Sequence, residues 1–345
     1  MMTTLEVDAL RSVGVIGAGT WGIALARMLS NSGHAVTVWS ATESKVADLS
    51  ASRIHKNLPD VRLPDEISFT ASLQRVCAGK DVLLFAVPSV AVRSVTEAAR
   101  THVAPEQLIV DVAKGIEADT LLTMSEVIRD VLRTDGLHDG VKIVALSGPT
   151  HAEEVALDMP TAIVSACEDL AAAELVQDVF TTAFMRVYTN TDIKGVELCG
   201  ALKNIIALTT GISAGLGYGD NAKAALITRG LAEIERLGRK LGCAEQTFSG
   251  LAGMGDLIVT ATSRHSRNNR AGYLIGRGCR PEEAVRQVGM VVEGINALPA
   301  AVTLAKRYDV DMPIVMAADA IINHGADPKR IVTDLMGREK RAERN

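Results

Sequence analysis

The stretch Ser12-Val-Gly-Val-Ile-Gly17-Ala-Gly19-Thr20-Trp21-Gly22 decides the fold of this chain. An apolar run typical of a buried strand leads into a G-x-G-x-x-G pattern, and good helix formers follow from Ile23. Strand, glycine turn and helix in this order are the context in which the pattern binds a dinucleotide. Gly17 would allow the tight turn, Gly19 would let a pyrophosphate approach the backbone, and Gly22 would let helix and strand pack closely. The helix N-terminus would then offer free N–H groups to the phosphates.

Apolar runs separated by helix-period segments continue through the first half of the chain. Between the strands we expect helices, for example over Trp21–Ser32 and Ile116–Thr134. This alternation predicts an α/β fold with a mainly parallel, doubly wound sheet covered by helices on both faces. The predicted strands are Ser12–Gly17, Ala35–Trp39, Val82–Val87, Leu108–Val112, Lys142–Ser147, Thr161–Ala166 and Arg186–Thr189.

The strand signals stop after about Thr189. Long segments rich in Ala, Leu, Ile and Gly follow and predict helices over Thr191–Gly215, Asn221–Leu241 and Gly294–Arg307. We therefore expect a dinucleotide-binding domain over residues 1–190 and an all-helical domain over residues 191–345. No Pro/Ser-rich linker separates them, which favours direct packing with a cleft between the two domains.

Length and composition agree with two globular domains. The chain has 345 residues, of which 48% are hydrophobic and 22% charged, so intrinsic disorder is excluded. Aromatic residues make up only 3%, whereas 29 residues are Gly, which predicts close helix packing and glycine-built loops. The net charge of −5 disfavours a broad nucleic-acid-binding surface.

Neither a metal site nor a membrane segment is predicted. The five cysteines form no C-x-x-C pattern and the histidines no H-E-x-x-H pattern, so reduced thiols in a cytoplasmic protein fit best. Residues 1–11 lack the pattern of a signal peptide. The most hydrophobic run, Val82–Val92, is too short to span a bilayer and contains Pro88.

Two motifs place polar residues at the carboxyl ends of predicted strands, where open α/β sheets bind ligands. Lys114 follows the strand that ends at Val112; the alternative is an ordinary exposed lysine at a helix start. Gly148 would let a ligand touch the backbone after the strand Lys142–Ser147. Thr150 with Glu153 predicts a capping box for the next helix.

Two further motifs lie in the helical half. Lys203 interrupts an apolar helix, and burial would lower the pKa of its ammonium group until proton transfer near neutrality becomes feasible. Cys199, one turn earlier, is interpreted as a small packing residue. The loop Gly253-Met-Gly-Asp256 precedes Ser266-Arg267-Asn268, where Ser266 is the expected N-cap of a helix. An anion would be favoured at that helix start, unless the arginine is merely solvated.

The end of the second strand leaves the choice of dinucleotide open. An NAD-selective site usually places Asp or Glu there, but this chain has Ser40 and Ala41, and the nearest acid, Glu43, is expected in the next helix. The basic residues Lys45 and Arg53 are remote in sequence from this strand end, so both NAD and NADP stay candidates.

Together these motifs resemble the bacterial family of NAD(P)-dependent glycerol-3-phosphate dehydrogenases. The resemblance runs in order across nearly the whole chain, and Gly217–Gly238 is its most distinctive part. The matching segments are GAGTWGIALA, AKG at 113–115, SGPTHAEEVA, LKN at 202–204, GLGYGDNAKAALITRGLAEIERLG, GMGDL, SRN and VVEG at 291–294.

The resemblance implies a Rossmann domain followed by a helical domain of the 6-phosphogluconate dehydrogenase C-terminal type, usually paired as a homodimer. It implies reduction of dihydroxyacetone phosphate to sn-glycerol 3-phosphate for phospholipid synthesis, with Lys203 as the acid/base and with Lys114 and Asp256 beside it. The substrate contacts implied are Lys114, Gly148, Thr150, Lys203, Asp256, Ser266, Arg267 and Asn268. The implied dinucleotide contacts are Gly17, Gly19, Thr20, Trp21, Gly22, Ala41, Lys114, Ala152, Arg267, Val291 and Glu293.

Two alternatives share the architecture. One is a related 6-phosphogluconate or 3-hydroxyacid dehydrogenase with a helical second domain, against which the segments GDNAKAALITRG and SRN argue. The other is a protein that binds a dinucleotide without turnover, against which Lys203, Lys114 and Asp256 argue. The family pattern often has Ser where Thr150 stands, a change that keeps the hydroxyl group.

Overall fold

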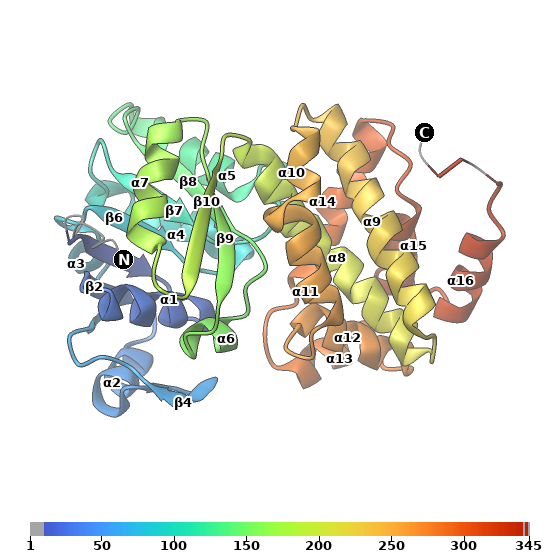
Figure 1. Ribbon diagram of the computed structural model, residues 1–345, viewed down its shortest axis with the longest axis horizontal. Coiled ribbons are helices and arrows are strands. Elements are labelled where there is room, and N and C mark those ends of the chain that lie inside the picture. Colours follow the sequence, from blue (N-terminus) through green and yellow to red (C-terminus); the bar gives the residue numbers. More distant parts are fainter. Residues whose placement is uncertain (1–9, 341, 344–345) are drawn as a thin grey trace, which may run out of the picture.

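The computed structural model describes residues 10–340 and 342–343, so most of the segment that bears on a signal peptide lies outside the described residues. A sheet flanked by helices forms one half of the molecule and a helical bundle forms the other (Figure 1). The sheet has the order β10-β9-β8-β7-β6-β1-β2-β5. Its strands are β1 (Ser12–Ile16), β2 (Ala35–Trp39), β5 (Ser68–Thr70), β6 (Val82–Phe85), β7 (Leu108–Asp111), β8 (Lys142–Ser147), β9 (Thr161–Ala166) and β10 (Met185–Asn190).

The sheet topology is that of a dinucleotide-binding fold. β5-β2-β1-β6-β7-β8 are parallel neighbours, which is the 3-2-1-4-5-6 order with its switch point between β1 and β6. β9 pairs antiparallel with β8 and parallel with β10, so these two strands run opposite to the rest. All seven predicted strands are present, and the prediction of a mainly parallel sheet is confirmed.

The sequence patterns missed β5 and the small hairpin of β3 (Ile54–His55) and β4 (Leu58–Arg62). Two of these strands, β3 and β5, are only two and three residues long, and Pro59 interrupts β4. None of the three is therefore an apolar run of the kind that predicts a strand.

Helices cover both faces of the sheet, and two apolar clusters fill the space between helices and strands. One predicted helix, over Ile116–Thr134, is too long: it begins at Met124, because Thr123 and Glu126 form a capping box and Leu121 has a positive φ of 62°. The helices of this half are α1 (Thr20–Asn31), α2 (Glu43–Ser52), α3 (Leu73–Cys77), α4 (Val92–Ala99), α5 (Met124–Leu132), α6 (Ala152–Ala156) and α7 (Leu170–Phe180).

The described residues after Asn190 form helices and turns around the long helix α8 (Ile193–Gly215). By length and composition α8 could cross a membrane, but 94% of its apolar window is buried inside the protein, so it is the core helix of this half. The remaining helices are α9 (Asp220–Lys240), α10 (Glu245–Ser249), α11 (Asp256–Thr262), α12 (Arg267–Gly276), α13 (Pro281–Val288), α14 (Glu293–Arg307), α15 (Pro313–Ile322) and α16 (Pro328–Met336).

Glycines let α8 and α12 touch backbone to backbone. A Cβ at Gly272 would lie 2.0 Å from the carbonyl oxygen of Leu208, and one at Gly276 would lie 2.2 Å from that of Ile212. On α8, a Cβ at Gly211 would lie 2.1 Å from a carbonyl oxygen of α12. The close helix packing predicted from composition is thus found here, and it fixes the start of α12 against α8.

We predict that Gly272→Ala destabilises the protein by about 2–3 kcal/mol, although Ala is the better helix former by about 1 kcal/mol, because α12 must move off α8. Gly219→Ala is the control: Gly219 has a φ of −89° and nothing within 4 Å of an added Cβ, so its cost should stay below about 1 kcal/mol. Denaturant unfolding measures both, and equal stability of the two variants would refute the close-contact argument.

Candidate active site

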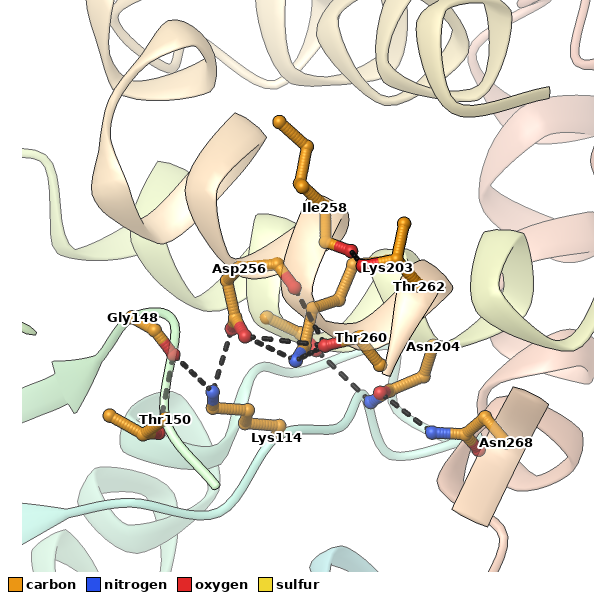
Figure 2. Close-up of polar contacts among 11 residues, drawn as sticks. Lys114, Gly148, Thr150, Lys203, Asn204, Asp256, Ile258, Thr260, Thr262 and Asn268 are labelled. Carbon is orange, nitrogen blue, oxygen red and sulfur yellow. Dashed lines mark hydrogen bonds and ion pairs between the residues drawn. The ribbon is translucent and has the colours of Figure 1, made fainter. Parts of the chain in front are cut away.

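One buried carboxylate binds two ammonium groups that come from different parts of the fold. Asp256 is the first residue of α11 and is 0% exposed. Its Oδ1 accepts a hydrogen bond from Lys203 Nζ of α8 at 2.5 Å, and its Oδ2 accepts one from Lys114 Nζ, after β7, at 2.6 Å. Figure 2 shows both ammonium groups converging on this carboxylate. The structure therefore joins three residues that lie far apart in the sequence.

Lys203 is buried, as its apolar helix predicted, and its ammonium group has a second partner. Nζ donates to Thr260 Oγ1 at 2.6 Å, and this hydroxyl in turn donates to the backbone oxygen of Asp256 at 2.6 Å. The pKa of Lys203 is lowered to about 7: burial is the main cause, Asp256 opposes the shift, and the charge of Lys114 adds to it. Lys203 can therefore exchange a proton near neutrality.

Lys114 also connects the network to the turn after β8. Its Nζ donates to the carbonyl oxygen of Gly148 at 3.1 Å, and the Thr150 hydroxyl donates to the same oxygen at 3.2 Å. The capping box expected from Thr150 and Glu153 is wrong: His151 is the N-cap of α6, because the Thr150 hydroxyl turns back to Gly148. Lys114 is also not an ordinary exposed lysine, since only 18% of its side chain is exposed.

The Ser266-Arg267-Asn268 segment starts α12 as predicted. Ser266 Oγ accepts from the N–H of Asn269 at 3.2 Å, which confirms the N-cap. Asn268 is buried; its Nδ2 donates to Asn204 Oδ1 at 2.9 Å, and its Oδ1 accepts from Gly294 N at 2.8 Å. Asn268 thus ties α12 to α8 and α14.

Arg267 differs from its neighbours because its side chain is exposed at the start of α12. Within residues 10–340 and 342–343 it forms no ion pair. The guanidinium group can therefore meet an anion at a helix end whose dipole favours negative charge.

The glycine loop after β1 fits the phosphates of a dinucleotide. Gly17 has a φ of 127°, and a Cβ there would lie 2.5 Å from the Ala86 oxygen on the neighbouring strand end. A Cβ at Gly22 would lie 2.2 Å from the Gly17 oxygen, so α1 packs tightly on the turn. At Gly19 the nearest atom is 4.0 Å away, and no side chain caps α1. The loop therefore combines open backbone at Gly19 with free N–H groups.

The other residues predicted to contact the dinucleotide lie at or just before the N-terminal ends of helices. Thr20 Oγ1 accepts from Asn57 Nδ2 at 2.9 Å, and Trp21 packs against the core of the sheet. Ala152 begins α6, and Val291 precedes α14. Glu293, the first residue of α14, accepts from the N–H and the hydroxyl group of Ser89 at 3.1 and 2.6 Å.

Ala41 is not part of the lysine network. It is exposed just beyond β2, whereas Lys114 follows β7, three strands away across the sheet. No sequence pattern singled out Thr260, Ser89 or Asn57. Thr260 could have been found, because it lies one helical turn after Asp256 and so shares its face.

The fold and the site define a class of protein: NAD(P)-dependent dehydrogenases in which a helical domain follows a Rossmann domain. Residues 12–173 match the sequence profile of the NAD-dependent glycerol-3-phosphate dehydrogenase N-terminus, and residues 192–333 match that of its C-terminus. The chain belongs to the NAD-dependent glycerol-3-phosphate dehydrogenase family.

Full-length relatives agree with this assignment. The chain is 64% identical over 334 residues to glycerol-3-phosphate dehydrogenase [NAD(P)+] 2 of Lactobacillus delbrueckii subsp. bulgaricus, covering 97% of this chain and 99% of that protein. It is 48% identical to the Bacillus subtilis glycerol-3-phosphate dehydrogenase [NAD(P)+], covering 96% and 95%. A crystal structure of glycerol-3-phosphate dehydrogenase from Coxiella burnetii matches with a TM-score of 0.89 at 34% identity, over 95% and 99% of the chains.

We predict that Thr260→Val destabilises the protein by about 1–3 kcal/mol, because the buried ammonium group of Lys203 loses an acceptor. Thr262→Val is the matched control on the same helix: its exposed hydroxyl donates to the Ile258 oxygen at 2.7 Å, and its loss should cost less than about 1 kcal/mol. Unfolding free energies measure the difference, which should vanish if Thr260 does not support Lys203.

Proposed function

We propose that this protein reduces dihydroxyacetone phosphate to sn-glycerol 3-phosphate with NADH or NADPH, in a reversible reaction that supplies the backbone of phospholipids. The observation that carries this proposal is the buried carboxylate of Asp256 between two ammonium groups, one of which has a pKa near neutrality. Such a group can donate a proton to an alkoxide and take it back in the reverse direction.

Lys203 is the proposed acid/base. When bound, the nicotinamide dinucleotide supplies the hydride for the carbonyl carbon. Lys203 Nζ donates its proton to the oxygen at that carbon, and Lys114 adds positive charge that stabilises the developing negative charge. Asp256 holds both ammonium groups in place and raises the pKa of Lys203 against the effect of burial.

The phosphate group of the substrate is proposed to lie at the start of α12. Arg267 is exposed there, Ser266 caps the helix, and Asn268 is held by Asn204 and Gly294. The turn at Gly148 and Thr150 would border the other side of the substrate, because it already touches Lys114. Binding at both ends would place the carbonyl group beside Lys203.

The proposed dinucleotide site extends over both halves of the molecule. The glycine loop would hold the pyrophosphate, and Lys114, Ala152, Arg267, Val291 and Glu293 would surround the nicotinamide end. At the adenosine end Ala41 offers no side-chain hydrogen bond. Ser40 and Ala41 bring no carboxylate to select NAD, and Arg53 donates to the Ile67 backbone oxygen at 2.7 Å instead. We therefore expect both dinucleotides to be used.

Three further proposals concern organisation. We place the domain boundary between residues 190 and 191, which falls between the end of β10 and Asp192, the N-cap of α8. The resemblance to the family supports a homodimer, which sedimentation would detect. The unpaired cysteines support a cytoplasmic location.

The direct test is steady-state reduction of dihydroxyacetone phosphate with NADH and NADPH in parallel. We expect turnover with both, and a loss of kcat of about 10²–10⁴-fold in Lys203→Met, since the acid/base is gone. Binding of NADH, followed by its fluorescence, should change little in this variant. Oxidation of neither dinucleotide by the wild type would refute the function, and turnover of a hydroxyacid instead would favour the related dehydrogenases.

The pH dependence tests the role of Lys203. Reduction needs the protonated ammonium group, so kcat/KM for reduction should fall as pH rises through about 7, whereas kcat/KM for oxidation should rise. In Asp256→Asn the charge that raises the pKa of Lys203 is gone, so the inflection should move to lower pH. Asp220→Asn, which breaks the exposed pair with Lys223, is the control. An unmoved inflection in Asp256→Asn would contradict the assignment.

A further inference from the structure

His151 lies beside the lysine network but has no role in the function proposed so far. It lies between Thr150 and α6 and occupies the N-cap position of that helix, but its side chain makes no capping hydrogen bond. Its Nε2 is buried and, within the described residues, makes no hydrogen bond of normal geometry. A buried imidazole nitrogen without a partner is unfavourable, which points to a ligand that provides one.

The surroundings of the ring place it at the site. The backbone of Val259, which directly precedes Thr260 on α11, lies within hydrogen-bonding range of the ring, and the charge of Lys203 acts on the ring as well. On another side its ring centroid lies 5.8 Å from that of His265, which precedes the N-cap of α12. The imidazole is therefore bordered by the elements proposed to hold the carbonyl and the phosphate group of the substrate.

The surroundings of the ring favour its neutral form. Burial lowers the pKa of His151, and the positive charge of Lys203 lowers it further. The Val259 backbone and the carboxylates of Glu153 and Glu154 oppose this shift without cancelling it. A neutral imidazole has one donor and one acceptor nitrogen, which suits a hydroxyl group better than a phosphate.

The proposed substrate has one polar group that lacks a partner. Its phosphate is assigned to α12 and its carbonyl oxygen to Lys203, but the hydroxyl on the carbon next to the carbonyl is unassigned. That hydroxyl lies one carbon from the reacting centre, so its partner must be close to Lys203. The Thr150 hydroxyl already donates to Gly148, and both ammonium groups are bound to Asp256.

We propose that His151 is a substrate-binding residue whose Nε2 hydrogen-bonds to the hydroxyl group next to the carbonyl carbon of the substrate. This inference rests on the proposed function and deepens it, because it names the group that distinguishes a hydroxymethyl ketone from a methyl ketone. A site that binds a substrate hydroxyl group rejects the analogue without it, since a buried polar group is then left unpaired.

The test compares dihydroxyacetone phosphate with hydroxyacetone phosphate, which has a methyl group in place of the hydroxymethyl group. In the wild type we expect kcat/KM to be higher for dihydroxyacetone phosphate by about 10–100-fold. In His151→Phe this ratio should fall several-fold, through loss of activity on dihydroxyacetone phosphate alone. His151→Gln, which keeps a donor and an acceptor, should retain part of the preference.

His265→Phe is the matched control, because its ring borders the same site but is exposed, and it should keep the wild-type ratio. Bound NADH and unfolding midpoints show whether each variant is folded; if His151→Phe does not fold, His151→Gln and His151→Asn carry the comparison. An unchanged ratio in the folded His151 variants, or an equal loss on both substrates, would overturn the role of His151. A wild type inactive on dihydroxyacetone phosphate would instead refute the proposed function itself.

Discussion

The carboxylate of Asp256 is the constraint on which the site depends. Two ammonium groups share one buried carboxylate, so the cluster has an excess of positive charge that burial makes unfavourable. Burial lowers the pKa of Lys203, the more deeply buried lysine, and the charge of Lys114 lowers it as well, so that the pKa is about 7 although Asp256 opposes the shift. Burial and the second ammonium group, which make the cluster unfavourable, therefore also give Lys203 a pKa suited to the proposed acid/base role near neutrality.

The glycine contact between α8 and α12 sets the distance between this cluster and the proposed phosphate end. With Gly211 and Gly272 the two helix backbones touch, and the first turn of α12 is brought next to Asn204, the residue after Lys203. Larger residues would push α12 outward and move Arg267 away from the lysines. The low aromatic and high glycine content of this half therefore has a structural consequence. Because the helix backbones lie close together, the groups proposed to bind the two ends of a three-carbon substrate are close enough to contact it at the same time.

The sequence determines the sheet more clearly than the site. Long apolar strands and the glycine turn are local patterns, so all seven predicted strands and the start of α1 were found. Thr150 was misassigned, because a hydroxyl group that could cap a helix prefers the Gly148 carbonyl that Lys114 also binds. Such choices depend on residues more than thirty positions apart. Local sequence patterns predict neither this competition nor the contact between Lys114 and Asp256. Only the resemblance to a family indicated that these two residues share a site.

The two halves meet through an apolar cluster, in which Val164 and Ala166 of β9 pack with Ile193 and Val196 of α8, and through polar contacts at the site. Lys114 reaches Asp256, Ser89 reaches Glu293, and Asn57 lies near both Thr20 and Met290. The apolar cluster holds the sheet and α8 together away from these polar groups. A ligand that touches both sides adds to the polar contacts. The proposed site therefore lies among the contacts that fix the relative position of the sheet and the helical half.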